Sequence, residues 1–109
     1  MFIRIFTYFQ DEYKIKMMIN EIINKQIDNI NKVEYITIEP YWKIEGVYKV
    51  EVEVDLESEL TEQVREKFLY SISDKWTYFG KPIEEALASE TTEGCNYIKD
   101  GINMINIIF

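Results

Sequence analysis

The chain has 109 residues, the length of one domain, and we expect a single domain with its own core over residues 1–109. Its residues are 47% hydrophobic and 15% aromatic, which excludes a disordered chain. The net charge of −8 opposes binding to nucleic acid or to an anionic membrane and favours a basic partner, although an acidic surface also serves solubility alone.

The residues that are missing narrow the chemistry further. There is no histidine and Cys95 is the only cysteine, which excludes a Ser-His-Asp triad, an imidazole metal ligand and an internal disulfide. We expect no metal and no other cofactor. No apolar run approaches the roughly 20 residues that cross a bilayer, and Arg4 interrupts the apolar start of the chain, so we expect a cytoplasmic protein without a signal peptide.

The chain begins with a strand pattern and then a helix pattern. Residues 2–9 are mainly β-branched and aromatic. Both faces of a strand formed by them would be largely apolar, which predicts a central strand of the sheet. Asp11 is a suitable N-cap for an amphipathic helix of about five turns, whose apolar residues recur at three- and four-residue spacing from Ile15 to Ile30.

The stretch from Val47 to Leu56 has the clearest pattern in the chain. Apolar and charged side chains alternate strictly, which is typical of a strand with one buried and one exposed face. A shorter strand is predicted over residues 33–39, where Pro40 ends it, and the loop between the two strands makes antiparallel pairing expected.

The remaining elements are a second helix and a less regular C-terminal third. Ser58 is the expected N-cap of an amphipathic helix that ends near Ser73. Residues 75–79 predict a short strand, residues 82–89 a short helix opened by proline, and residues 102–109 a terminal strand.

This order of elements predicts an α+β fold. Its first five elements match the split β-α-β, or ferredoxin-like, plan: an antiparallel sheet with two amphipathic helices on one face. The C-terminal helix and strand would be an addition to that plan. The other face of the sheet would be open, and because this fold hosts many functions, it assigns none by itself.

The exposed acids of the Val47–Leu56 strand are the first candidate for a functional surface. They could be a solvated face, or they could bind Lys and Arg side chains of a partner. A metal site is the poorest alternative, because residues two apart on a strand lie about 6–7 Å from each other, too far for compact coordination. The three acids are Glu51, Glu53 and Asp55.

Two further groups could take part in binding a partner. Tyr41 and Trp42 lie in the loop after Glu39, where aromatic residues often anchor interfaces, although Trp42 could equally fold back over the core. Glu90 and Glu93 belong, with Glu84 and Glu85, to a second acidic stretch, which is either a solvated surface or a partner contact.

Two segments carry a resemblance to a known class of proteins. Residues 74–89, which include the sequence DKWTYFGKP, and the terminal INMINIIF resemble segments of small bacterial immunity proteins. Such proteins neutralise the toxins of contact-dependent and other polymorphic toxin systems, and they are similar to this chain in length, acidity and cytoplasmic location. The resemblance implies a basic toxin as partner, often a nuclease, whose active site or a neighbouring surface is covered. It transfers no functional residue by position.

Charge and resemblance together predict a non-enzymatic immunity protein, a monomer or weak dimer, that inhibits a basic toxin without binding nucleic acid or membrane. The alternative is a ferredoxin-like module that binds a small molecule or regulates as a dimer. A small enzyme is disfavoured, because no histidine and no acid/base pair is evident. The expected toxin-binding residues are Glu51, Glu53, Asp55, Tyr41, Trp42, Glu39, Glu90 and Glu93.

Overall fold

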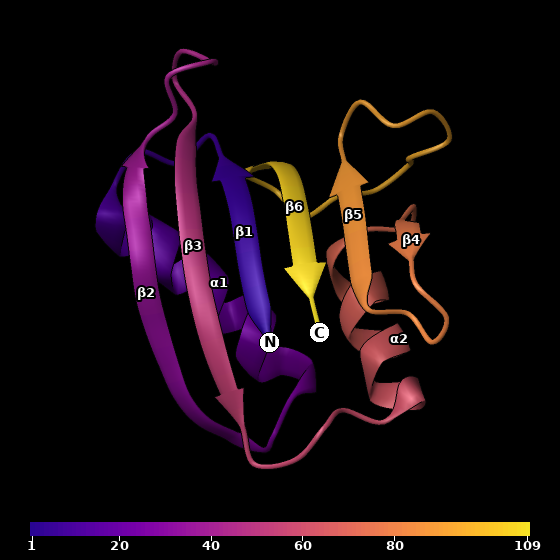
Figure 1. The fold of residues 1–109 in the computed structure, drawn as a ribbon. Helices are drawn as coiled ribbons and strands as arrows, with labels where there is room; N and C mark the ends of the chain where they lie inside the picture. Colours follow the sequence, from indigo (N-terminus) through magenta and orange to yellow (C-terminus); the bar gives the residue numbers. More distant parts are fainter.

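The computed structural model describes all residues from 1 to 109 and has an α+β fold, with two helices and one six-stranded antiparallel sheet (Figure 1). The sheet order is β2-β3-β1-β6-β5-β4. The elements are β1 (Phe2–Thr7), α1 (Glu12–Gln26), β2 (Ile30–Pro40), β3 (Tyr48–Leu56), α2 (Glu62–Ile72), β4 (Thr77–Phe79), β5 (Glu85–Ser89) and β6 (Ile102–Ile108). Neither helix is long and apolar enough to cross a membrane.

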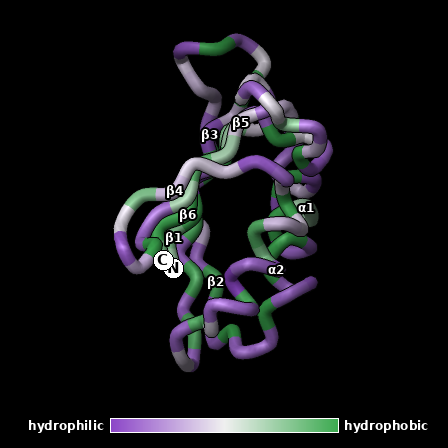
Figure 2. Tube along the Cα trace, turned by 90° about the vertical axis from the view of Figure 1, so that its right-hand side faces the viewer, coloured by the Kyte–Doolittle hydropathy of each residue, from purple (hydrophilic) through white to green (hydrophobic).

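Both helices lie on the same face of the sheet and leave the other face open (Figures 1 and 2). The core fills the space between the helices and the central strands. Alternate residues of β1, β3 and β6 enter it, and isoleucines of α1 and Phe68 of α2 meet them from the other side. The most completely buried of these residues include Ile3, Ile5, Ile15, Ile19, Ile23, Val50, Val52, Phe68, Ile105 and Ile107, each at 0% exposure.

The predicted strands of the first half are confirmed. β1 is central, because it pairs with β3 on one side and with β6 on the other. β3 pairs antiparallel with β2, and its valines are buried while Glu53 and Asp55 on the alternate positions are exposed. β2 is longer than residues 33–39, since it begins at Ile30.

The first helix starts as predicted and ends earlier. The Asp11 side chain accepts hydrogen bonds from the backbone N–H groups of Tyr13 at 2.8 Å and Lys14 at 3.3 Å, as expected of an N-cap. The helix does not reach Ile30. Ile27 already has extended backbone angles, with φ −114° and ψ 124°, so its side chain joins the core from a non-helical position.

The predicted N-cap of the second helix is wrong. Thr61, not Ser58, caps α2, and its side chain accepts a hydrogen bond of 3.2 Å from the backbone N–H of Val64. Ser58 has another role: its carbonyl and hydroxyl oxygens accept hydrogen bonds from Asn29 Nδ2 at 3.0 and 3.1 Å. The chain between β3 and α2 is thereby tied to the chain between α1 and β2.

The predicted helix over residues 82–89 is also wrong, because residues 85–89 form β5. Its Ala86 and Ala88 pair with Ile107 and Ile105 of β6 and are buried with them, so the alternation of a strand governs the segment. The short strand predicted near residue 77 is confirmed as β4, and the terminal strand is confirmed as β6. The added C-terminal segment therefore widens the sheet.

Candidate functional site

The middle of the open sheet face holds an ion pair that neutralises one of the predicted site residues. Arg4 of β1 donates hydrogen bonds from Nε and Nη2 to Glu51 Oε2, at 3.0 and 2.9 Å. Partial burial alone would raise the pKa of Glu51, but hydrogen bonds from Arg4 and Thr37 outweigh it and hold the pKa below its ordinary value. Glu51 is thus a charged group with an internal partner.

One end of the sheet carries the loop between β2 and β3, which projects beyond the other strands (Figure 1). We call this region, with Tyr41, Trp42, Glu39 and Glu90, the hairpin end. The ring of Tyr41 packs on Phe6, with 4.7 Å between the centroids. Trp42 does not fold back over the core: it is 84% exposed, and its only cationic neighbour is Lys43, with Nζ 5.1 Å from the ring centroid.

The acids at the hairpin end are largely engaged within the chain. Glu39 forms an ion pair with Lys49 at 3.2 Å. Glu90 Oε1 accepts hydrogen bonds from the Tyr8 hydroxyl and from Asn103 Nδ2, the latter at 3.2 Å. The bond to Glu90 raises the pKa of Tyr8, because it stabilises the neutral phenol as the donor. Glu93 lies exposed in the loop between β5 and β6.

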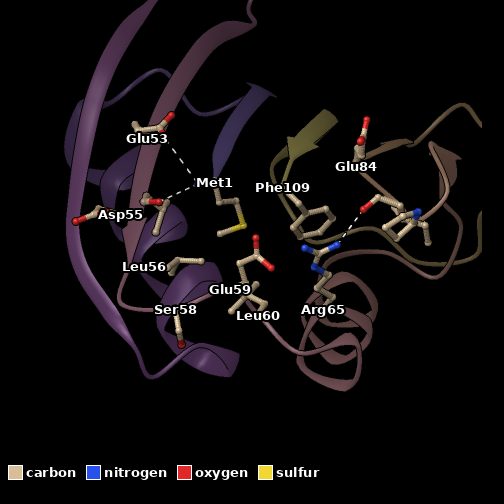
Figure 3. Close-up of a pocket in the computed structure, with 13 residues that line it drawn as sticks. Met1, Glu53, Asp55, Leu56, Ser58, Glu59, Leu60, Arg65, Glu84 and Phe109 are labelled. Atoms are coloured by element: carbon tan, nitrogen blue, oxygen red, sulfur yellow. Dashed lines mark hydrogen bonds and ion pairs between the residues drawn. The ribbon is translucent and has the colours of Figure 1, made fainter.

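The opposite end of the sheet is hollow. A cavity of about 510 Å³ lies between the end of β3, the start of α2 and the start of β5 (Figure 3). We call this region the cavity end. Four carboxylates contribute to its lining: Glu53, Asp55, Glu59 and Glu84. In Figure 3, Glu59 points into the cavity between Met1 and Phe109.

The carboxylates of the cavity end differ from those of the hairpin end because most have no partner. Asp55, Glu59 and Glu84 are exposed, and their side chains form no ion pair or hydrogen bond within the chain. Glu53 Oε1 lies 3.7 Å from the amino group of Met1. In Figure 3, Asp55 and Glu84 lie on opposite sides of the cavity, and among these three acids Glu59 is the one that points into it.

Arg65 is the one basic side chain that lines this cavity, and it is held in place by its neighbours. Its Nη1 donates a hydrogen bond of 2.9 Å to the carbonyl of Ile83, and its guanidinium lies 4.5 Å from the ring centroid of Phe109. These contacts hold its charge against the cavity wall, and it forms no ion pair with the carboxylates of the lining.

A second cavity of about 570 Å³ adjoins the first along α2 and the turn between β4 and β5. Its additional lining combines apolar and aromatic side chains with charged ones: Leu69, Tyr70 and Tyr78, and Glu62, Glu66 and Lys81. Burial raises the pKa of Tyr78, and the neighbouring Tyr70 and Glu66 raise it further, so its phenol stays protonated and can donate a hydrogen bond.

The predicted site residues therefore fall into separate regions. Asp55 lies seven positions after Tyr48 along β3, which corresponds to about 23 Å between the hairpin end and the cavity end. Glu53 and Asp55 belong to the cavity end, whereas Tyr41, Trp42, Glu39 and Glu90 belong to the hairpin end. Glu59 and Glu84 were missed by sequence reasoning, although Glu84 opens the second acidic stretch.

No group of three or more carboxylates or thiols is placed to hold a metal ion. Comparison with known proteins found no matching family model, no matching curated protein and no matching solved structure.

Proposed function

We propose that this chain is a bacterial immunity protein, a non-enzymatic cytoplasmic inhibitor that binds a basic toxin, a nuclease, with the cavity end of its sheet. One observation supports it above the others: Asp55, Glu59 and Glu84 have no partner in the chain and surround a cavity of about 510 Å³. A Lys or Arg side chain could lay its apolar stem against Leu60 and Phe109 and bring its charge to Glu59, which points into the cavity.

The same charges support inhibition of a nuclease. A nuclease binds phosphate through a basic surface, so a negative surface of complementary shape steers its approach and competes with the substrate. An interface of standard size spans about 30 Å, so one partner lying across the open face could reach Trp42 as well as the cavity end. Trp42, exposed on a projecting loop, would then be a second anchor.

We further propose that the fold is of the ferredoxin-like type. The strand order β2-β3-β1-β6, with both helices on one face, is in keeping with that plan when β6 is counted as its fourth strand. The pair β4 and β5 would then be an insertion before the last strand, placed at the sheet edge beyond β6.

A second candidate function is a module that binds a small molecule. It is favoured by the cavity of about 570 Å³ beside α2, since ligand pockets commonly measure about 300–1,000 Å³ and have apolar and aromatic walls. Thermal-shift measurements with a panel of metabolites distinguish it: stabilisation by a metabolite without any protein partner would favour this function.

The proposed function is tested by affinity capture of the tagged chain from its native cells at low and moderate salt, followed by titration with the purified partner. The cavity-end variant is Glu53→Lys/Asp55→Lys, and the matched control is Glu12→Lys/Glu21→Lys. Both variants change the net charge by the same amount, and the control acids are exposed on α1, which covers the other face of the sheet.

We expect a basic nuclease that is inhibited by the wild-type chain, with binding weakened about tenfold or more by the cavity-end variant and much less by the control. Equal affinity for both variants would remove the cavity end from the interface. A captured partner that is not basic, or no partner at all, would contradict the proposed function.

A further inference from the structure

The two cavities adjoin around the start of α2, and we call them together the groove. Five residues line both of them: Leu60, Arg65, Pro82, Ile83 and Phe109. The stacked side chains of Arg65 and Phe109 stand where the cavities meet, and the hydrogen bond from Arg65 to the Ile83 carbonyl fixes this position. An occupant that extends from one cavity to the other would therefore pass over this pair.

The two parts of the groove differ in chemistry. The first carries the free carboxylates of Asp55, Glu59 and Glu84, whereas the second places Leu69 and the rings of Tyr70 and Tyr78 beside charged side chains. The first part thus attracts a cation, and the apolar and aromatic part of the second wall suits a large apolar side chain. A ligand that matches both must carry both groups a short distance apart.

We propose that the groove binds an extended segment of the toxin in which a Lys or Arg residue is followed at short spacing by an aromatic residue. This inference rests on the proposed function, since it identifies what the basic partner inserts. The cation enters the carboxylate-lined cavity, and the aromatic ring packs between α2 and the β4–β5 turn. Charge complementarity selects this occupant over a second copy of the chain, because two such negative grooves repel each other.

The test uses a series of short peptides, acetylated at the N-terminus and amidated at the C-terminus. Each peptide begins with Lys and ends with Phe, and zero, one, two or three alanines separate the two residues. Binding is followed by the shifts of backbone amide NMR signals of the full chain. Matched peptides replace Lys with Gln or Phe with Ala. We expect shifts confined to both cavities for one spacing, with at least about fivefold weaker binding for each matched peptide.

Two variants examine the parts of the groove separately. Asp55→Asn/Glu59→Gln removes charge from the first cavity, and Tyr70→Ala shortens an α2 side chain that is 55% exposed, so neither is expected to disturb the core. Tyr13→Ala on α1 is the matched control, because Tyr13 is 72% exposed and lies outside the groove. Each groove variant should weaken the best peptide at least about fivefold, and Tyr13→Ala should leave its affinity unchanged.

Peptide binding that does not depend on Lys, or shifts outside the groove, would overturn the inference. If a toxin binds and depends on Glu53 and Asp55, yet ignores Tyr70→Ala and the peptides, the proposed function stands and the inference fails. If no basic partner binds the chain in any assay, the proposed function itself fails.

Discussion

The hairpin end and the cavity end of the sheet are both rich in acids, but they use them differently. At the hairpin end Glu90 is bound by Tyr8 and Asn103, and Glu39 is paired with Lys49. At the cavity end Asp55, Glu59 and Glu84 have no internal partner. The pairing of acids, more than their number, therefore distinguishes a surface that stabilises the fold from one that is free to bind.

Paired and free carboxylates differ in the free energy that they gain on binding a partner, because a paired carboxylate must first exchange its internal partner for the new one. A carboxylate already paired within the chain must give up that partner before it binds a cation of another protein, so its net gain is small. A free carboxylate in a hollow gives up only water. The cavity end therefore gains more from a basic partner, and the predictions below separate structural from binding roles at the two ends.

The largest expected effect on stability is at Gly101, which lies at the hairpin end, directly before β6. Its φ is +90°, and an added Cβ would lie 2.6 Å from the Phe9 ring. Its carbonyl accepts hydrogen bonds from Thr7 Oγ1 at 2.7 Å and from the Tyr8 backbone N–H at 2.9 Å. Gly101→Ala should destabilise the protein by about 3 kcal/mol, from backbone strain and displacement of the ring. Urea unfolding at neutral pH measures this.

The control for this prediction is Gly94→Ala. Gly94 also has a positive φ, of +86°, but the nearest atom to an added Cβ is Lys75 Cε at 3.9 Å. Gly94→Ala should lower the free energy of unfolding only by the strain of a side chain at positive φ, about 1–2 kcal/mol. Equal losses at both positions would show that the Phe9 contact does not contribute.

A smaller effect is expected from the Arg4–Glu51 pair between the two ends. Arg4→Ala leaves Glu51, whose side chain is 17% exposed, without its cation, and should lower stability by about 1–2 kcal/mol at pH 7. The folded-state pKa of Glu51 lies below the ordinary 4.5, so this stabilisation is fully present above that pH and is lost as the pH falls through the folded-state value.

Urea unfolding from neutral pH down through the pKa of Glu51 checks the contribution of the Arg4–Glu51 pair. The difference in free energy of unfolding between wild type and Arg4→Ala should shrink as the pH falls. In a Glu51→Gln background, Arg4→Ala should have little further effect at any pH. Glu34→Gln is the control, since Glu34 is an exposed acid on the neighbouring strand, 3.9 Å from Lys32. A difference that does not vary with pH would assign the effect of Arg4 to packing on Phe2, whose ring centroid lies 5.3 Å from its guanidinium carbon.

Much of the fold could be predicted because the burial of β3 follows its strict alternation, and Asp11 has the side chain that an N-cap requires. The errors have physical causes. The sequence Glu-Ala-Leu-Ala favours a helix locally, but pairing with β6 makes it the strand β5. Ser58 and Thr61 are both suitable caps, and the bonds between Ser58 and Asn29 decide between them.

The candidate site was predictable only in part, because it depends on contacts between distant segments. Glu53 and Asp55 could be selected from a single strand, but no sequence period places Glu84 and Glu59 in the lining of one cavity. Likewise, nothing in the local sequence distinguishes Glu51, which Arg4 neutralises from the neighbouring strand, from the other acids of β3.

The smallest expected effect on stability separates the two aromatic residues of the hairpin end. Tyr41→Ala removes a ring that packs on Phe6 and should destabilise the protein by about 1 kcal/mol. Trp42→Ala should change the stability by less than about 0.5 kcal/mol, because the side chain is 84% exposed. A large loss for Trp42→Ala would instead give this residue a structural role.

Trp42 can also report how far a bound toxin extends. The only other tryptophan, Trp76, is 8% exposed and donates Nε1 hydrogen bonds to the carbonyls of Leu69 and Ser73, so acrylamide should quench mainly the fluorescence of Trp42. Protection of Trp42 in a complex that also depends on Glu53 and Asp55 would mean that the proposed partner crosses the open face over about 23 Å, from the cavity end to the hairpin end. Unchanged quenching in a complex that depends on Glu53 and Asp55 would confine the interface to the cavity end.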